Sequence, residues 1–202
     1  MKDWRLALTL LGRDWRSGQL RLLALALVLV VAAVTSVGWL AERVAGASGR
    51  AAAELLAADA AVETSTASRN EWVEEAQRRG LQTARTAEFP SVVLAGDRAQ
   101  LVSVKAAEPA YPLRGELRIR PHLAAPEQAA RGAPEPGRIW VDPALLNLLD
   151  IEVGDSIALG RSELRVEALI ALEADRGGLF SGFAPRVLMN WGDLEATGLI
   201  QP

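Results

Sequence analysis

Few residues in this chain have the types and spacing that catalysis or metal binding requires. The 202 residues include no cysteine and a single histidine, His122, which excludes thiol nucleophiles and metal sites built from histidine or cysteine. Neither of the two lysines, Lys2 and Lys105, follows a glycine, so the chain has no Gly-Lys-Ser/Thr phosphate loop for ATP hydrolysis. Ser181 lacks the glycine spacing of a nucleophile elbow. The sequence therefore predicts no catalytic residue, no cofactor and no metal ion.

The clearest structural signal is an uncharged apolar run of twenty residues, Leu22 to Ala41. A helix rises about 1.5 Å per residue, so this run measures about 30 Å, the thickness of a bilayer's hydrocarbon core. We therefore expect a transmembrane helix over residues 20–41. Ala45-Gly46-Ala47 resembles a signal-peptidase site, which leaves a cleaved signal peptide as the alternative. The run is about twice as long as the apolar core of a usual signal peptide, which favours a retained helix.

The basic residues around this run predict its orientation. Five of them precede it, whereas only Arg43 and Arg50 follow within the next twenty residues. The positive-inside rule then predicts a cytoplasmic N-terminus, a single span in the plasma (inner) membrane, and a periplasmic location for the bulk of the chain.

Residues 1–19 have the pattern of an amphipathic helix, with tryptophans on one face and arginines on the other. We expect this leader to lie in the cytoplasmic headgroup region, because Gly18 favours a break before the span. The alternative is that it extends the span into the cytosol. The residues expected at the membrane interface are Trp4, Trp15, Arg16, Arg21 and Trp39.

The rest of the chain predicts an α+β fold in several parts. A stalk helix is expected over 42–58, and a mixed α/β unit over 59–106, with a strand at 60–64 and a helix at 70–79 packed on one sheet face. Six of the ten prolines fall in 107–138, which predicts an irregular connection. A small β-rich subdomain is expected over 139–172, with Asp142 and Pro143 starting a short helix. Residues 173–202 are expected to return to the α/β unit.

A glycine-flanked loop holds two of the chain's three phenylalanines. Its large apolar residues, Leu179, Phe180 and Phe183, follow no strand or helix period. One hypothesis is that they form an apolar contact loop for the membrane, a neighbouring subunit or a lipid-like substrate. The other is that both rings pack under the loop against the β-rich unit.

Several segments, taken in order, resemble the N-terminal part of an FtsX-like, MacB-type ABC transporter permease, in the YbbP-like branch. Together they cover most of the chain: Leu11–Val44, Arg85–Ala106, Tyr111–Ile119, Ile139–Gly160 and Phe183–Pro202. The resemblance implies a first transmembrane helix followed by a periplasmic domain in two parts. It also implies a separate ATP-binding subunit as partner, in keeping with the missing phosphate loop.

The resemblance implies a permease subunit that couples ATP hydrolysis by its partner to movement of the periplasmic domain. Export or extraction of lipid-like or hydrophobic substrates is the expected activity. Further expected contacts are membrane lipids and a second permease copy or a periplasmic protein. The net charge of −3 argues against nucleic acid. Permeases of this kind carry more spans, so we expect a fragment of a longer protein. The alternative is a single-pass sensor or adaptor with a periplasmic binding domain.

Overall fold

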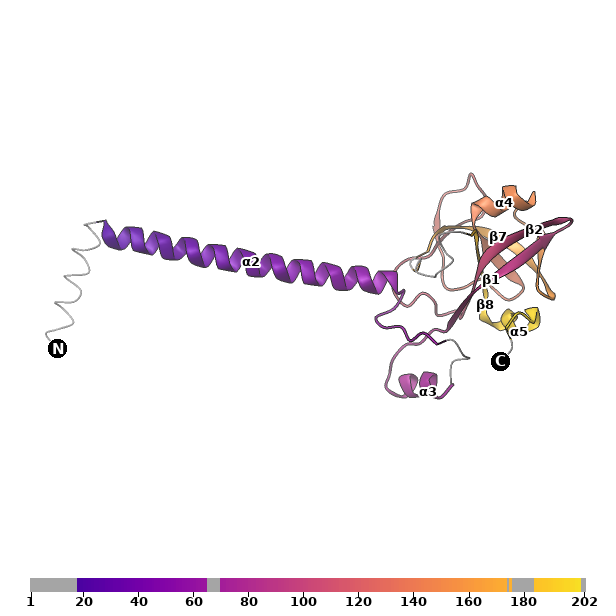
Figure 1. Cartoon of the computed structure of the whole chain (residues 1–202), viewed down its shortest axis with the longest axis horizontal. Coiled ribbons are helices and arrows are strands. Elements are labelled where there is room, and N and C mark those ends of the chain that lie inside the picture. Colours follow the sequence, from indigo (N-terminus) through magenta and orange to yellow (C-terminus); the bar gives the residue numbers. More distant parts are fainter. Residues whose placement is uncertain (1–17, 65–69, 174, 176–183, 201–202) are drawn as a thin grey trace. The chain divides into compact units, whose positions relative to one another are not determined.

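The computed structural model describes residues 18–64, 70–173, 175 and 184–200. The chain divides into two compact units, Met1–Arg50 and Ala51–Pro202. An apolar helix in the first unit is followed by a mixed sheet in the second (Figure 1), so the predicted α+β class is confirmed. The leader expected over residues 1–19 lies outside the described residues, apart from its last two.

The long helix α2 runs from Gln19 to Leu55. Gly18 precedes this helix. Its φ of +87° is a conformation that glycine adopts without a steric penalty. Within α2, the 23 residues Arg21–Arg43 contain an 18-residue window with a mean hydropathy of 2.5, and the stretch is long and apolar enough to cross a membrane. The hydroxyls of Thr35 and Ser36 donate to carbonyls one turn earlier, so neither is left unpaired in this apolar stretch. The helix continues without a break past residue 41 into the range predicted for the stalk helix, 42–58, and ends at Leu55.

Eight strands form one sheet in the second unit, in the order β4-β3-β7-β5-β8-β2-β1-β6. Their bounds are β1 Thr86–Ala95, β2 Arg98–Ala107, β3 Arg118–Arg120, β4 Gln128–Ala129, β5 Arg138–Val141, β6 Ser156–Leu159, β7 Ser162–Leu172 and β8 Arg186–Asn190. β6 also pairs with β7, which closes β7, β5, β8, β2, β1 and β6 into a barrel and leaves β3 and β4 as an extension. The pairs β2–β8 and β5–β7 are parallel and the others antiparallel.

One apolar core fills the barrel. On β2, Val102, Val104 and Ala106 face inward and are fully buried, as the period of two in a strand requires. Helix α4, Pro143–Leu149, adds three buried leucines to this core. The α/β unit and the β-rich subdomain that we expected as separate parts therefore share a sheet and a core. β8, from the expected return segment, lies between β2 and β5 and joins them.

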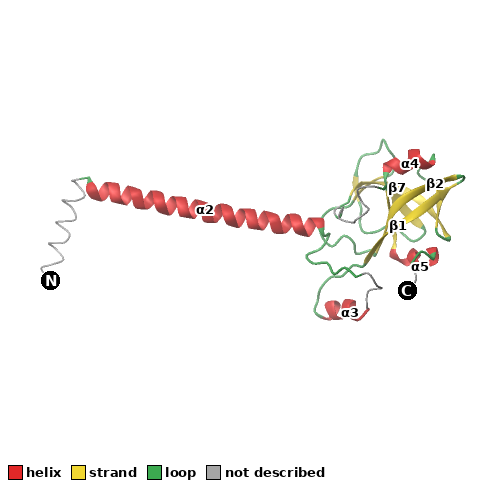
Figure 2. Ribbon diagram, in the orientation of Figure 1, coloured by secondary structure: helices red, strands yellow, loops and turns green. Residues whose placement is uncertain are grey.

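The start of α4 confirms a local prediction. The Asp142 carboxylate accepts from the Ala144 backbone N–H at 2.8 Å, and Pro143 occupies the first turn, where no N–H partner is needed. Two further short helices follow β8, the 3-10 helix η1 at Trp191–Asp193 and α5 at Leu194–Thr197. In the view of Figure 2, α4 and α5 lie on opposite sides of the strands.

Three local predictions differ from the structure. Residues 60–64 are exposed and form no strand, because no neighbouring strand offers them pairing. Helix α3, Asn70–Arg78, forms as expected but buries no residue, so its predicted packing on the sheet is wrong. Its one tryptophan, Trp72, is half-exposed, and its only other apolar residues are Val73 and Ala76, which gives α3 little to bury. The segment 107–138 contains β3 and β4, and is less irregular than its prolines suggested.

Leu169 and Leu101 test the assignment of the core. Leu169 on β7 is 0% exposed and Leu101 on β2 is 53% exposed. Replacing Leu169 with alanine should lower the free energy of unfolding by about 2–5 kcal/mol, because it leaves a cavity. Leu101→Ala should change it by about 0.5 kcal/mol or less. Chemical unfolding of the detergent-solubilised chain measures both, and equal losses would contradict the assignment.

Candidate functional site

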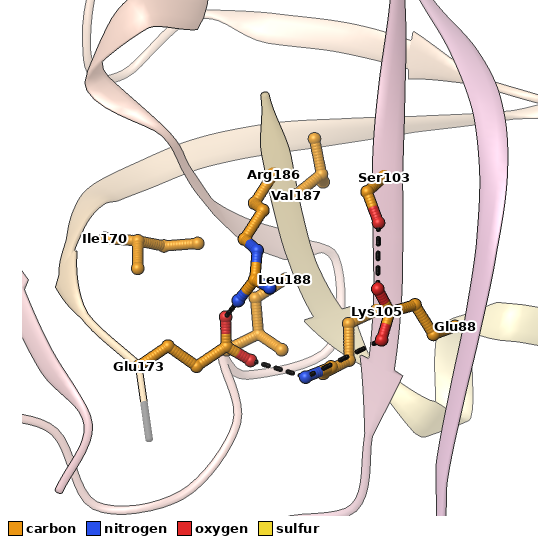
Figure 3. Close-up of a pocket in the computed structure, with 8 residues that line it drawn as sticks. All are labelled: Glu88, Ser103, Lys105, Ile170, Glu173, Arg186, Val187 and Leu188. Carbon is orange, nitrogen blue, oxygen red and sulfur yellow. Dashed lines mark hydrogen bonds and ion pairs between the residues drawn. The ribbon is translucent and has the colours of Figure 1, made fainter. Parts of the chain in front are cut away.

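The outward face of the barrel wall carries a cluster of buried charges. On β2 the inward valines alternate with Ser103 and Lys105, which point to the opposite face. On β8, which lies beside β2, Arg186 points to this same outward face. Glu173, directly after β7, completes the set (Figure 3). Three elements distant in sequence thus bring a lysine, an arginine and a glutamate together.

The carboxylate of Glu173 is the centre of this cluster. Its side chain is 3% exposed, and that of Lys105 is 7% exposed. Glu173 Oε1 accepts from Lys105 Nζ at 2.9 Å, and Oε2 accepts from Arg186 Nη1 at 2.5 Å. Because a buried charge without partners is strongly unfavourable, these two cations make an ionised Glu173 possible at this position.

Tyr111 adds a neutral donor to the same carboxylate. Its hydroxyl donates to Glu173 Oε1 at 2.9 Å, and Lys105 Nζ lies 5.5 Å from the centre of its ring. Burial, together with the negative charge of Glu173, raises the pKa of Tyr111 well above its ordinary value of 10.0. The phenol therefore stays protonated and continues to donate. Tyr111 belongs to the connection between β2 and β3, so the cluster also holds that connection to the sheet.

Two more carboxylates surround Lys105. Its ammonium lies 3.2 Å from Asp175 Oδ2 and 4.0 Å from Glu88 Oε2. Lys105 Nζ and Arg186 Nη1 both donate to the Asp175 backbone carbonyl at 3.1 Å. Three acidic and two basic side chains give the cluster a net charge of −1. Among the described residues, no acceptor binds the buried Nη2 of Arg186.

The geometry of the cluster is that of a structural ion network. The eight side chains drawn in Figure 3 line a small pocket. Ser103, the one hydroxyl among them, donates to Glu88 Oε1 at 3.1 Å and has no histidine base nearby to activate it. Nor do the described residues include a group of three or more histidine, cysteine, aspartate or glutamate side chains that could hold a metal ion. What the network does is tie β2, β7, β8 and Tyr111 together.

Beyond the cluster, the same outward face becomes apolar and exposed. Val92 on β1 pairs with Leu101 on β2, two residues past the Pro90–Ser103 pair, so these side chains share the face of Lys105. Val92, Leu94 and Leu101 are each about half exposed. We call these three residues the apolar strip. A contiguous apolar surface of this kind is typical of contact surfaces.

The residues predicted from the sequence for the membrane interface are described only in part. Arg21 and Trp39 lie on α2, at or near the two ends of its apolar stretch. The Arg43 guanidinium stacks 4.4 Å from the Trp39 ring centre, a cation–π contact that suits a membrane interface. Trp4, Trp15 and Arg16 lie outside the described residues. The same holds for Leu179, Phe180 and Phe183, so the apolar contact loop stays a prediction.

Sequence reasoning did not find the buried cluster. The alternation of Lys105 with Val102 and Val104 was visible, and a lysine inside a valine-rich strand was the available signal. Its main partner, Glu173, is 68 residues away, however, and no local pattern connects them.

The comparisons with known proteins agree with the predicted resemblance. No family model matches the chain. Over 192 residues, which is 94% of this chain, it is 35% identical to an uncharacterized ABC transporter permease, YbbP, of Escherichia coli (strain K12). The aligned region is 23% of that relative, so the chain spans about a quarter of its length. The predicted resemblance to a YbbP-like permease is confirmed.

Lys105 and Arg98 give a matched test of the buried cluster. Lys105→Met leaves Glu173 buried with one cation fewer and should lower the free energy of unfolding by about 3 kcal/mol. Arg98→Met breaks an exposed pair with Asp150, 3.1 Å long, and should cost about 1 kcal/mol or less. Denaturant unfolding compares the two, and a loss for Lys105→Met no larger than for Arg98→Met would contradict the burial of this charge.

Tyr111 can be titrated without interference because it is the chain's only tyrosine. Its folded pKa lies above the unfolded value of 10.0, so its contribution to stability is present below that pH and is lost as the pH rises further. Ultraviolet absorbance should show no tyrosinate in the folded chain at about pH 11, and tyrosinate should appear together with unfolding. Ionisation near pH 10 while circular dichroism stays native would show that the hydroxyl is not buried against Glu173.

Proposed function

We propose that this chain is the N-terminal part of the permease subunit of an ABC transporter, with α2 as its first membrane span. The observation that carries the proposal is the 35% identity to a permease over nearly the whole chain. The apolar stretch Arg21–Arg43 supports it, since its length and composition suit one bilayer crossing. A separate ATP-binding subunit hydrolyses ATP and drives movement of the outer unit.

In this proposal the N-terminus is cytoplasmic and the barrel is periplasmic. The excess of basic residues before the span supports that orientation. The substrates are lipid-like or hydrophobic molecules, which are exported or extracted from the membrane. The exposed apolar strip, Val92, Leu94 and Leu101, supports an apolar contact on the outer unit.

The absence of cysteine allows a direct test of this topology. Single cysteines are introduced at Lys2 in the leader and at Ala99 on β2, and intact spheroplasts are treated with a membrane-impermeant maleimide. The reagent should modify Ala99→Cys and should reach Lys2→Cys only after the membrane is permeabilised. Labelling of Lys2→Cys alone in intact spheroplasts would invert the proposed orientation.

A second experiment separates a permease subunit from a single-pass sensor or adaptor. The tagged chain, expressed at its native level and purified from membranes in mild detergent, is exposed to azido-ATP and light. A permease subunit should bring with it a second polypeptide that takes up the photolabel and is protected by unlabelled ATP. A purified chain without any ATP-protected labelling would favour the adaptor and contradict the proposal.

A further inference from the structure

The chain makes a sharp turn where it leaves α2. Ala57, two residues after the end of the helix, has φ +51°, a left-handed conformation that a residue with a side chain rarely adopts. It is 3% exposed and packs in a second apolar cluster with Tyr111, Leu117 and Trp140 on the outward face of the sheet. A strained and buried residue at this point indicates that the surrounding structure holds the turn in place.

Arg114 holds this turn through both its main chain and its side chain. Its backbone N–H donates to the Ala57 carbonyl at 2.9 Å. Its guanidinium donates twice to the Asp59 carboxylate, from Nε to Oδ1 at 2.9 Å and from Nη2 to Oδ2 at 2.8 Å. This paired geometry fixes direction as well as distance. The hydrogen bonds from the Arg114 side chain also hold the pKa of Asp59 below its usual value, so the pair persists to lower pH than an unpaired aspartate would allow.

The connection that carries Arg114 is itself anchored on both sides. Before Arg114, the Tyr111 hydroxyl binds Glu173 in the buried ion cluster. After it, Leu117 is buried, and its carbonyl accepts from the Ala130 N–H at 2.8 Å. A continuous series of contacts therefore leads from the end of α2, through Arg114 and Tyr111, to Glu173 and the barrel strands.

We propose that Arg114 is a positioning residue that, through Ala57 and Asp59, holds residues 51–55 at the end of α2 in a fixed direction from the barrel strands of the same unit. The proposal rests on the permease function, in which movement of the membrane helix must reach the outer unit. If the contacts at Ala57 and Asp59 hold the helix end rigidly, movement of the helix also moves the barrel. If these contacts are loose, the turn after α2 bends and the barrel stays in place. The Asp59–Arg114 pair is exposed, and exposed pairs contribute little to overall stability. Its effect is therefore on geometry rather than on unfolding.

The chain offers a matched control in Arg98 and Asp150. This pair is also exposed and also joins residues far apart in sequence, but it lies away from Ala57 and makes one contact of 3.1 Å. Removing either pair should have the same small effect on thermal unfolding. Only the loss of Asp59–Arg114 should loosen the end of α2.

Spin labels measure this looseness on the full chain in lipid nanodiscs. Because the chain has no cysteine, labels can be placed at Ala53→Cys, two residues before the end of α2, and at Ala99→Cys on β2. Both positions lie in the unit Ala51–Pro202. Arg114→Ala should broaden the distance distribution by about twofold or more, since the paired contact that fixes direction is lost. Asp59→Arg combined with Arg114→Asp should narrow it again, and Arg98→Ala should leave it unchanged.

The proposal is overturned if Arg114→Ala leaves the distribution as narrow as in the parent chain. It is also overturned if the exchanged pair fails to restore the width, or if Arg98→Ala broadens it equally, which would indicate general loosening. Thermal unfolding of each variant confirms that the barrel is folded. No nucleotide or partner takes part, so failure here leaves the permease proposal intact. Failure to find an ATP-binding partner, in turn, leaves the Arg114 proposal intact.

Discussion

In the second unit, Ala51–Pro202, the buried carboxylate of Glu173 is the group through which strands β2 and β8 and the connection after β2 are held together. A buried carboxylate without hydrogen-bond donors is strongly unfavourable, and Glu173, whose side chain is 3% exposed, receives one donor each from Lys105, Arg186 and Tyr111. These donors come from β2, β8 and the connection after β2. These side-chain contacts to Glu173 add to the backbone hydrogen bonds that already pair β2 with β8. The connection to β3 is held by the same group, which places Arg114 beside the end of α2.

The inward and outward faces of the sheet differ in the side chains that they carry. The inward face is apolar throughout and closes into one core, with α4 supplying further leucines. The outward face changes along its length, from the covered cluster around Tyr111 and Trp140, through the buried ions, to the exposed apolar strip. The apolar contribution to stability therefore comes mainly from the barrel interior. The outward face carries both the contacts that reach the end of α2 and the exposed apolar strip.

The features predicted correctly from the sequence are those that depend on residues close together in the chain. The length of the apolar run is set by bilayer thickness, and Asp142-Pro143 is a helix start in almost any context, so α2 and the start of α4 were both predictable. Barrel closure was not predictable, because β8 pairs with β2 and β5 across long separations that leave no periodic pattern. The same is true of the cluster, where Tyr111 and Glu173 are 62 residues apart. The strand expected at 60–64 does not form, because a strand-like run needs a neighbouring strand to pair with and none of the described strands lies beside it.

The contacts of Arg114, Tyr111 and Glu173 hold the end of α2 to the barrel as one connected series. Amide hydrogen exchange of Arg114, whose N–H donates to Ala57, tests it most directly, in the parent chain and in Tyr111→Phe. Tyr111→Phe should speed exchange of the Arg114 amide by on the order of fivefold or more, because the connection then loses one of the hydrogen bonds that hold it. The Gly154 amide, which donates to Val166 at 2.8 Å within the barrel, should exchange at its original rate. Unchanged protection at Arg114 in Tyr111→Phe would contradict the account, because the turn after α2 would then be held independently of the buried cluster.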